Sequence, residues 1–98
     1  MYLIREIMYC KPGKVRPMVE KFVAMSTFME NKGMGKMRVM TDVSAERYWT
    51  IVAEFEVESL EKFMAMDTSP EMKEMESLMK GYHDLVDHGR REIYKIEA

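Results

Sequence analysis

The sequence predicts an α+β domain with the element order β-α-β-β-α-β, in which a four-stranded antiparallel sheet carries two helices on one face. Three observations give this prediction. Apolar residues alternate along residues 48–57, as in a strand with one face on a core. Apolar residues recur every three or four positions from 15 to 29, as in a helix. Ser59 then offers a helix cap where alternation gives way to helical spacing, so this strand leads directly into a second helix.

The first half of the chain supplies a strand, a helix and a short strand. Residues Tyr2–Cys10 carry apolar side chains at both parities, so we expect both faces of this strand to be buried. Turn residues at 11–14 end the strand, and Pro17 fits the first turn of the helix that follows. Gly33 supplies a left-handed cap after that helix, and residues 36–43 form the short strand.

A turn joins this short strand to the strand of residues 48–57. Odd-numbered apolar residues share one face in each strand, and Val43 and Trp49 are among them. The register that keeps both sets on the core pairs Lys36 with Glu54. We therefore expect Trp49 to be a core or pocket-wall residue.

The second helical region breaks within residues 67–71. Ser69 is the expected N-cap and Pro70 the expected first residue of a helix that restarts there. This helix is predicted to run to about His88, where Gly89 stops it.

Residues 91–97 form the last strand, which completes the split βαβ, or ferredoxin-like, arrangement. The chain is read as one domain, residues 1–98, near the lower limit of what buries a sufficient core by itself. The sheet face away from the helices is too apolar to leave in water, since it would hold Leu3, Ile7, Tyr9, Thr50 and Val52. We therefore expect a homodimer formed sheet to sheet.

Charged residues on this same face are interpreted as structural. Arg5, Lys36 and Arg38 are placed to neutralise Glu54 and Glu56. Buried charges must be paired whatever the protein does, so we favour this interpretation over a catalytic one.

The chain resembles the dimeric α/β-barrel superfamily in three stretches. These are Lys11-Pro12-Gly13-Lys14 after the first strand, residues 55–63 from strand to helix, and Ser69-Pro70-Glu71-Met72 at the helix restart. The superfamily includes antibiotic-biosynthesis monooxygenases, NIPSNAP-like proteins, haem-degrading monooxygenases and small cyclases. The resemblance implies that two sheets close into one barrel across a homodimer, and that each subunit holds a small-molecule pocket between its sheet and its helices.

Glu6 is the candidate catalytic residue. It is the only charge on the helix-facing side of the first strand, and burial can bring a carboxylate into the working range of a proton acceptor. The alternative is a structural carboxylate that reaches the rim or is hydrogen-bonded to Ser26, Tyr82 or Trp49. The other expected pocket residues, which would bind the ligand, are Met8, Phe22, Ser26, Trp49, Ala53 and Tyr82.

Two functions are compatible with this fold and pocket. The first is a small-molecule-binding enzyme of the cofactor-independent monooxygenase or isomerase kind, a reaction class implied by the resemblance alone. The alternative is a non-catalytic dimeric binding or interaction module on the same scaffold. The chain departs from two groups of relatives, so neither haem degradation nor a two-histidine cyclase mechanism is expected. The haem-degrading members' Asn, Trp and His positions hold Glu6, Met66 and Glu76, and the cyclase-like members' two His positions hold Ile4 and Met72.

Composition disfavours several other classes. The net charge of -2, from 15 basic and 17 acidic residues spread along the chain, gives no footprint for nucleic acid. A single cysteine suits a reducing, cytoplasmic compartment, and no apolar run approaches the roughly 18 residues of a membrane span.

We expect neither a metal nor a cofactor. The pairs His83 with Asp87 and Asp84 with His88, each four residues apart, are interpreted as a solvated helix end rather than as metal ligands. The 13 methionines are interpreted as core filling rather than as ligands of a soft metal.

Overall fold

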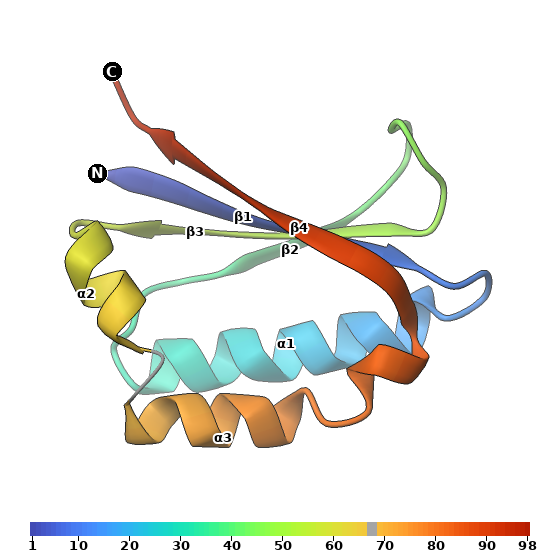
Figure 1. Ribbon diagram of the computed structural model, residues 1–98, viewed down its shortest axis with the longest axis horizontal. Helices are drawn as coiled ribbons and strands as arrows, with labels where there is room; N and C mark the ends of the chain where they lie inside the picture. The colour runs from blue at the N-terminus through green and yellow to red at the C-terminus, as the bar shows by residue number, and fades with distance from the viewer. Residues whose placement is uncertain (67–68) are drawn as a thin grey trace.

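The computed structural model describes residues 1–66 and 69–98 of the chain. The order of its elements confirms the predicted α+β fold (Figure 1). These elements are β1 (Tyr2–Cys10), α1 (Val15–Asn31), β2 (Arg38–Thr41), β3 (Thr50–Val57), α2 (Leu60–Ala65), α3 (Pro70–Leu78), the short 3-10 helix η2 (Tyr82–Asp84) and β4 (Val86–Lys95).

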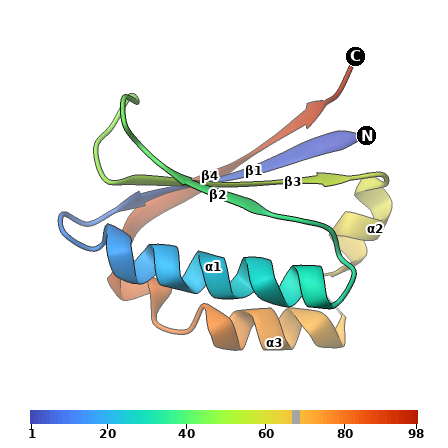
Figure 2. The ribbon, with the colours of Figure 1, turned by 180° about the vertical axis from the view of Figure 1, so that it is seen from behind.

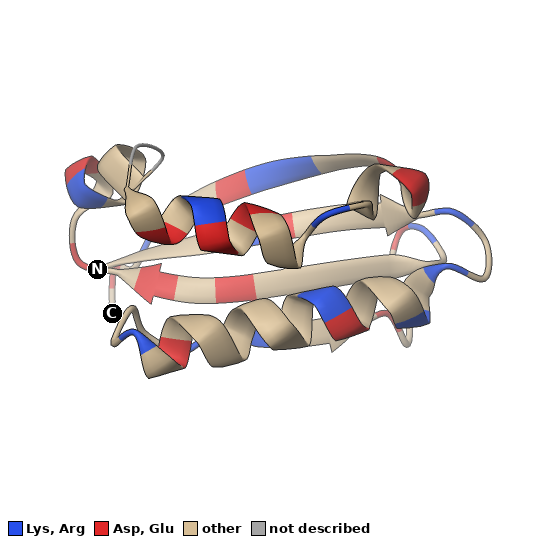
Figure 3. Ribbon diagram, turned by 90° about the horizontal axis from the view of Figure 1, so that it is seen from below, with Lys and Arg blue, Asp and Glu red and all other residues tan. Residues whose placement is uncertain are grey.

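The four strands form one antiparallel sheet in the order β2-β3-β1-β4. The central strands β1 and β3 pair from Tyr2 opposite Val57 to Tyr9 opposite Thr50. Helices α1 and α3 lie side by side beneath one face of the sheet, and both carry acidic and basic residues (Figure 3). Among the described residues no helix covers the other face (Figure 2). This arrangement confirms the expected ferredoxin-like fold.

Side-chain caps begin α2 and α3 where the sequence predicted them. Ser59 Oγ and Ser69 Oγ each accept a hydrogen bond from the backbone N–H three residues later, at 3.2 and 3.3 Å. Pro70 occupies the first turn of α3, where its missing N–H is not needed. The predicted restart at Ser69 is therefore confirmed, while Asp67 and Thr68 of the expected cap lie outside the described residues.

The end of α1 also follows the prediction. Gly33 has a φ of 69°, in the left-handed region that glycine adopts at little cost. Its N–H donates to the carbonyl of Glu30, and the N–H of Met34 donates to the carbonyl of Met29. These two bonds satisfy carbonyls of the last helical turn and lead the chain toward β2.

Helix α3 is shorter than predicted. It ends at Leu78, not near His88. Gly81, with a φ of 86°, turns the chain out of the helical path, and η2 follows directly. The prediction was wrong because the apolar spacing of the helix continues through Tyr82, although that residue lies beyond the end of α3.

Strand β4 correspondingly begins at Val86 rather than at Arg91. Gly89 is not a helix stop but lies within β4, opposite Met8 of β1. A Cβ at this position would be 2.3 Å from Met8 Sδ, so glycine is the residue that allows this close approach.

Strand β2 pairs with β3 two residues out of the predicted register. Arg38, not Lys36, lies opposite Glu54. The parity is unchanged, but the strand is shorter, so Val43 lies in the β2–β3 loop and is fully exposed rather than buried. Trp49 has a φ of 62° and lies outside β3, because this left-handed backbone cannot continue an extended strand.

The core lies between the helices and the sheet. Its largest fully buried side chains are those of Phe22, Ile4, Met18 and Ile51. None of the helices in the described part of the chain has the length and apolar character needed to cross a membrane.

The open face of the sheet carries an ion-pair network around Arg5. Its Nη1 donates to Glu92 Oε1 at 3.2 Å, and its Nε lies 3.2 Å from Glu54 Oε2. The second contact is an ion pair without an aligned hydrogen bond, so within the described residues this buried Nε–H is unsatisfied. Arg38 lies 3.9 Å from the other oxygen of Glu54. Two of the expected arginine contacts to Glu54 are thus present within one chain.

Candidate functional site

A cavity of about 580 Å³ lies between the sheet and the helices. Strands β1, β3 and β4 form one side of it, and α1, α2, α3 and η2 form the other. This volume falls within the range of pockets that hold small organic ligands.

Methionine side chains form much of its apolar wall. Spacings of three and four residues bring Met25 and Met29 to one side of α1, and Met72 and Met75 to one side of α3. Thioether chains are flexible and polarisable, so such a wall can adapt its shape to a ligand. Residues predicted as core filling are therefore in part the wall of a cavity. Eight of the 13 methionines line it: Met8, Met25, Met29, Met37, Met66, Met72, Met75 and Met79.

Glu6 and Arg91 form an ion pair in the sheet wall of this cavity. They lie opposite each other on β1 and β4, and Arg91 Nε donates to Glu6 Oε1 at 2.5 Å. The guanidinium also lies 5.0 Å from the ring centroid of Phe63, which packs against Phe55 with ring centroids 5.6 Å apart. The pair is thereby held between the sheet and α2. Within the described residues, Glu6 Oε2 makes no hydrogen bond, so this oxygen is available to a ligand.

The cavity has a second polar region on the side of α3. Glu76, Lys80 and His83 line it there, and all three side chains are exposed. The interior is therefore apolar between two charged ends. A molecule with an apolar body and at least one polar group matches this distribution.

Four of the predicted site residues line this cavity, and three do not. Ser26 Oγ donates to the carbonyl of Met37 at 2.8 Å and so joins α1 to the segment before β2. Ala53 is fully buried in β3 and does not reach the cavity surface. Placing Trp49 beside Glu6 was wrong. The four that line the cavity are Glu6, Met8, Phe22 and Tyr82.

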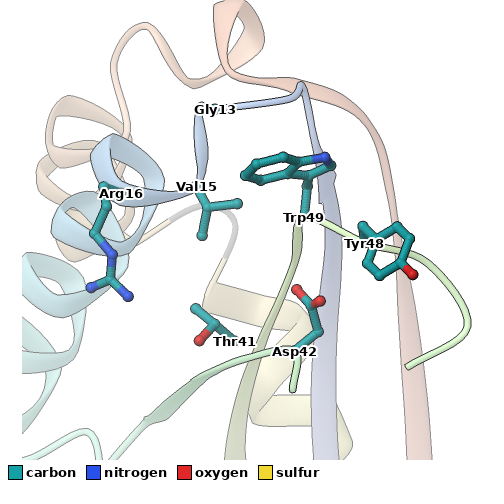
Figure 4. A pocket seen from close by; sticks show the side chains of 7 residues that line it. All are labelled: Gly13, Val15, Arg16, Thr41, Asp42, Tyr48 and Trp49. Atoms are coloured by element: carbon teal, nitrogen blue, oxygen red, sulfur yellow. The ribbon is translucent and has the colours of Figure 1, made fainter. Parts of the chain in front are cut away.

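Trp49 lies instead in a separate recess beside the start of α1 (Figure 4). The side chain is 44% exposed, so it is not a core residue. Alternation alone indicated a buried position, because the strand was assumed to begin before Trp49. The left-handed backbone there could not be read from the pattern.

Sequence reasoning missed Arg91 as a site residue. Its strand was expected to begin at Arg91 itself, so no register against β1 could be assigned. Once β4 begins at Val86, the pairing places Arg91 directly opposite Glu6. Opposite charges on neighbouring strands were the available signal.

The histidines near the end of the chain do not share a helix face. His83 lies in η2, whereas Asp87 and His88 lie in β4. The His88 ring centroid is 4.9 Å from that of Tyr9, and its Nε2 is 3.3 Å from Arg47 Nη1. Interpreting these residues as a helix end was therefore wrong. No cluster of three or more His, Cys, Asp or Glu side chains suited to a metal occurs among the residues described.

Cys10 is buried at the end of β1. Burial raises the pKa of its thiol, and the carboxylates of Asp42 and Asp87 raise it further. Because the thiolate is the reactive form, this residue is a structural thiol rather than a nucleophile.

Comparison of the sequence with protein-family models gives no match, and neither does comparison with curated proteins. Solved structures, in contrast, are similar along nearly the whole chain. An uncharacterised NIPSNAP domain protein from Burkholderia xenovorans is 14% identical with a TM-score of 0.73, and the match covers 100% of this chain and 96% of that one. A candidate antibiotic biosynthesis monooxygenase from Deinococcus radiodurans is 9% identical with a TM-score of 0.73, and the match covers 100% and 94%.

A third similar structure is a dimeric protein of unknown function and ferredoxin-like fold from Bacteroides fragilis. It is 12% identical with a TM-score of 0.69, and the match covers 97% of this chain and 96% of that one. At such identities the likeness shows the fold alone. It confirms, at the level of fold, the resemblance to the superfamily of NIPSNAP-like and antibiotic-biosynthesis-monooxygenase proteins.

Proposed function

We propose that this chain is a small-molecule-binding enzyme of the cofactor-independent monooxygenase or isomerase kind, with its ligand in the cavity beside Glu6. The observation that carries the proposal is the methionine-rich cavity of about 580 Å³ with the ion pair of Glu6 and Arg91 in its sheet wall. Candidate antibiotic biosynthesis monooxygenases share the fold, which supports the reaction class by analogy.

Both reactions begin with removal of a proton from a carbon acid. Arg91 holds one oxygen of Glu6, so the other oxygen is the proton acceptor, and the guanidinium lies beside the negative charge that develops. In an isomerase the proton returns to a different carbon. In a monooxygenase the carbanion is oxidised by dioxygen, so that a CH2 group and dioxygen give a carbonyl group and water.

Deuterium exchange tests the shared first step before the substrate is known. Aryl ketones with an acidic α-proton are incubated in heavy water, and proton loss is followed by NMR. At least one ketone should exchange about a hundredfold faster or more with the protein, and Glu6→Gln should abolish that gain. Glu74→Gln, which changes an exposed carboxylate of α3 outside the cavity lining, is the matched control. Equal exchange with the protein and with Glu6→Gln would contradict the catalytic assignment.

The alternative function, a non-catalytic binding module, is favoured by one observation: Arg91 already engages Glu6. Fluorescence of anilinonaphthalene sulfonate measures binding independently of catalysis. Met72→Trp fills the cavity and should weaken binding of this probe about tenfold, whereas the exposed Met64, outside the cavity, gives the control Met64→Trp. Binding of the probe without exchange of any ketone would establish the binding module instead.

We also propose that two copies pair through the open faces of their sheets to form one barrel. Ile7 and Tyr9 on this face are already buried within one chain, contrary to the expectation from the sequence. The apolar surface left for a partner is that of Leu3 and Val52, which are half-buried, and of Tyr94, which is 49% exposed. Covering such a face with a second sheet removes apolar surface from water. Sedimentation equilibrium tests the proposal, and a stable monomer at micromolar concentration would refute it.

A further inference from the structure

A second cavity, of about 440 Å³, lies between the start of α1 and the β2–β3 loop. Figure 4 shows the side chains that surround it. None of its lining residues lines the cavity beside Glu6. It is therefore a separate site, and what it binds does not depend on the function proposed above.

Hydrogen bonds fix the backbone on both sides of Trp49. The Trp49 carbonyl accepts from Cys10 N–H at 2.8 Å, and Asp42 Oδ1 accepts from Thr50 N–H at 2.9 Å. These bonds hold Trp49 in the left-handed backbone, which a bulky residue rarely adopts. As a result the indole leaves the line of β3 and lies over Val15 at one side of the recess (Figure 4). Its exposed ring is available to a ligand.

The recess also contains one acid and one base. Asp42 uses one carboxylate oxygen for Thr50, and its second oxygen makes no contact with a basic group in the described part of the chain. Arg16 likewise makes no ion pair with any described residue. Figure 4 shows these two side chains on either side of Val15. Opposite charges thus stand at two ends of a recess with an aromatic wall.

We propose that this recess binds a small zwitterion, with its ammonium group between Asp42 and the indole of Trp49 and its anionic group near Arg16. An ammonium group is attracted both by a carboxylate and by the face of an indole, the most favourable aromatic partner for a cation. A guanidinium recognises a carboxylate through paired donors. A ligand with both charges satisfies each lining group, whereas a ligand with one charge leaves a like charge facing it.

The fluorescence of Trp49 reports binding directly, because it is the only tryptophan in the chain. Glycine betaine is the zwitterionic probe. Tert-butylacetate has the same shape without the positive charge, and choline lacks the negative charge. Betaine should change the fluorescence saturably, with about tenfold higher affinity than either comparison molecule.

Two variants test which residue recognises each charged group of the ligand. Asp42→Asn keeps the acceptor for Thr50 and should remove the preference for betaine over tert-butylacetate. Arg16→Gln should remove the preference for betaine over choline. Glu46→Gln, which changes an exposed carboxylate of the same loop outside the recess, should leave all affinities within about twofold. A betaine response that does not saturate, or equal affinities for the three molecules in the unmodified protein, would overturn the proposal.

Discussion

Replacing Gly89 by alanine tests how closely β4 packs against β1. A Cβ at this position would be 2.3 Å from Met8 Sδ and 3.1 Å from the carbonyl oxygen of Ile7. Since non-bonded heavy atoms settle about 3.5–4.0 Å apart, the thioether must move by about 1.2–1.7 Å. Met8 lines the cavity, so its side chain has space to move into. The substitution should therefore be tolerated, but at a measurable loss of stability.

The size of that loss follows from two opposing effects. Overpacking costs about 1–3 kcal/mol, while replacing glycine restricts the unfolded chain and gains about 0.4–1 kcal/mol. We expect Gly89→Ala to lower the free energy of unfolding by about 1 kcal/mol. With Met8→Ala already present, the same change should be close to neutral, because the sulfur atom is gone. The coupling energy between the two substitutions should then be about 1 kcal/mol.

Urea unfolding of the four proteins at one fixed concentration measures this coupling, since dimerisation would make stability concentration-dependent. A second measurement is the binding of anilinonaphthalene sulfonate, which should weaken in Gly89→Ala because Met8 moves into the cavity. If Gly89→Ala destabilises both backgrounds equally, the loss comes from the backbone of β4. The contact with Met8 would then not be its cause.

Three further predictions concern the cap, the thiol and the open face. Ser69→Ala should lower the free energy of unfolding by about 1 kcal/mol through loss of the α3 cap. Ser77→Ala, at an exposed position of the same helix, should change it by less than about 0.5 kcal/mol. Equal effects of the two substitutions in urea unfolding would contradict a role of the cap in stability. The folded-state pKa of Cys10 is raised from 9.0, so its contribution to stability is complete below pH 9.0 and is lost as the pH rises through the folded value. The unmodified protein should therefore lose stability relative to Cys10→Ala above pH 9.0, and parallel pH profiles would disprove this. Glu54→Gln leaves Arg5 with Glu92 alone and removes the carboxylate beside Arg38, so it should raise the dimer dissociation constant about tenfold. Glu97→Gln, at a side chain that is 79% exposed, should leave sedimentation unchanged.

Local patterns predicted the elements whose form depends mainly on neighbouring residues. The bounds of β1 match the prediction, and α1 ends at Asn31, followed by the predicted left-handed Gly33. The caps at Ser59 and Ser69 also lie where the sequence placed them. Each depends on side-chain spacing or on a cap within one turn, so the residues themselves carry the information.

Features that depend on two segments distant in the sequence could not be predicted from local patterns. The pairing of β2 with β3 kept its parity but shifted by two residues, since parity cannot distinguish registers that differ by two. The end of α3 was wrong because apolar residues continue in helical spacing beyond Leu78. Pairing with β1 instead makes the segment from Val86 a strand.

The sequence by itself determined the order of the elements, the two-sided character of the sheet and the position of Glu6 on the helix-facing side of β1. Only the tertiary structure decided that Arg91 pairs with Glu6, that eight methionines leave a cavity rather than fill a core, and that Trp49 lies in a different recess. The physical reason is the range of the interactions involved. Alternation and capping act over a few residues, whereas an ion pair between residues 85 positions apart and the volume left between a sheet and its helices exist only after the chain has folded.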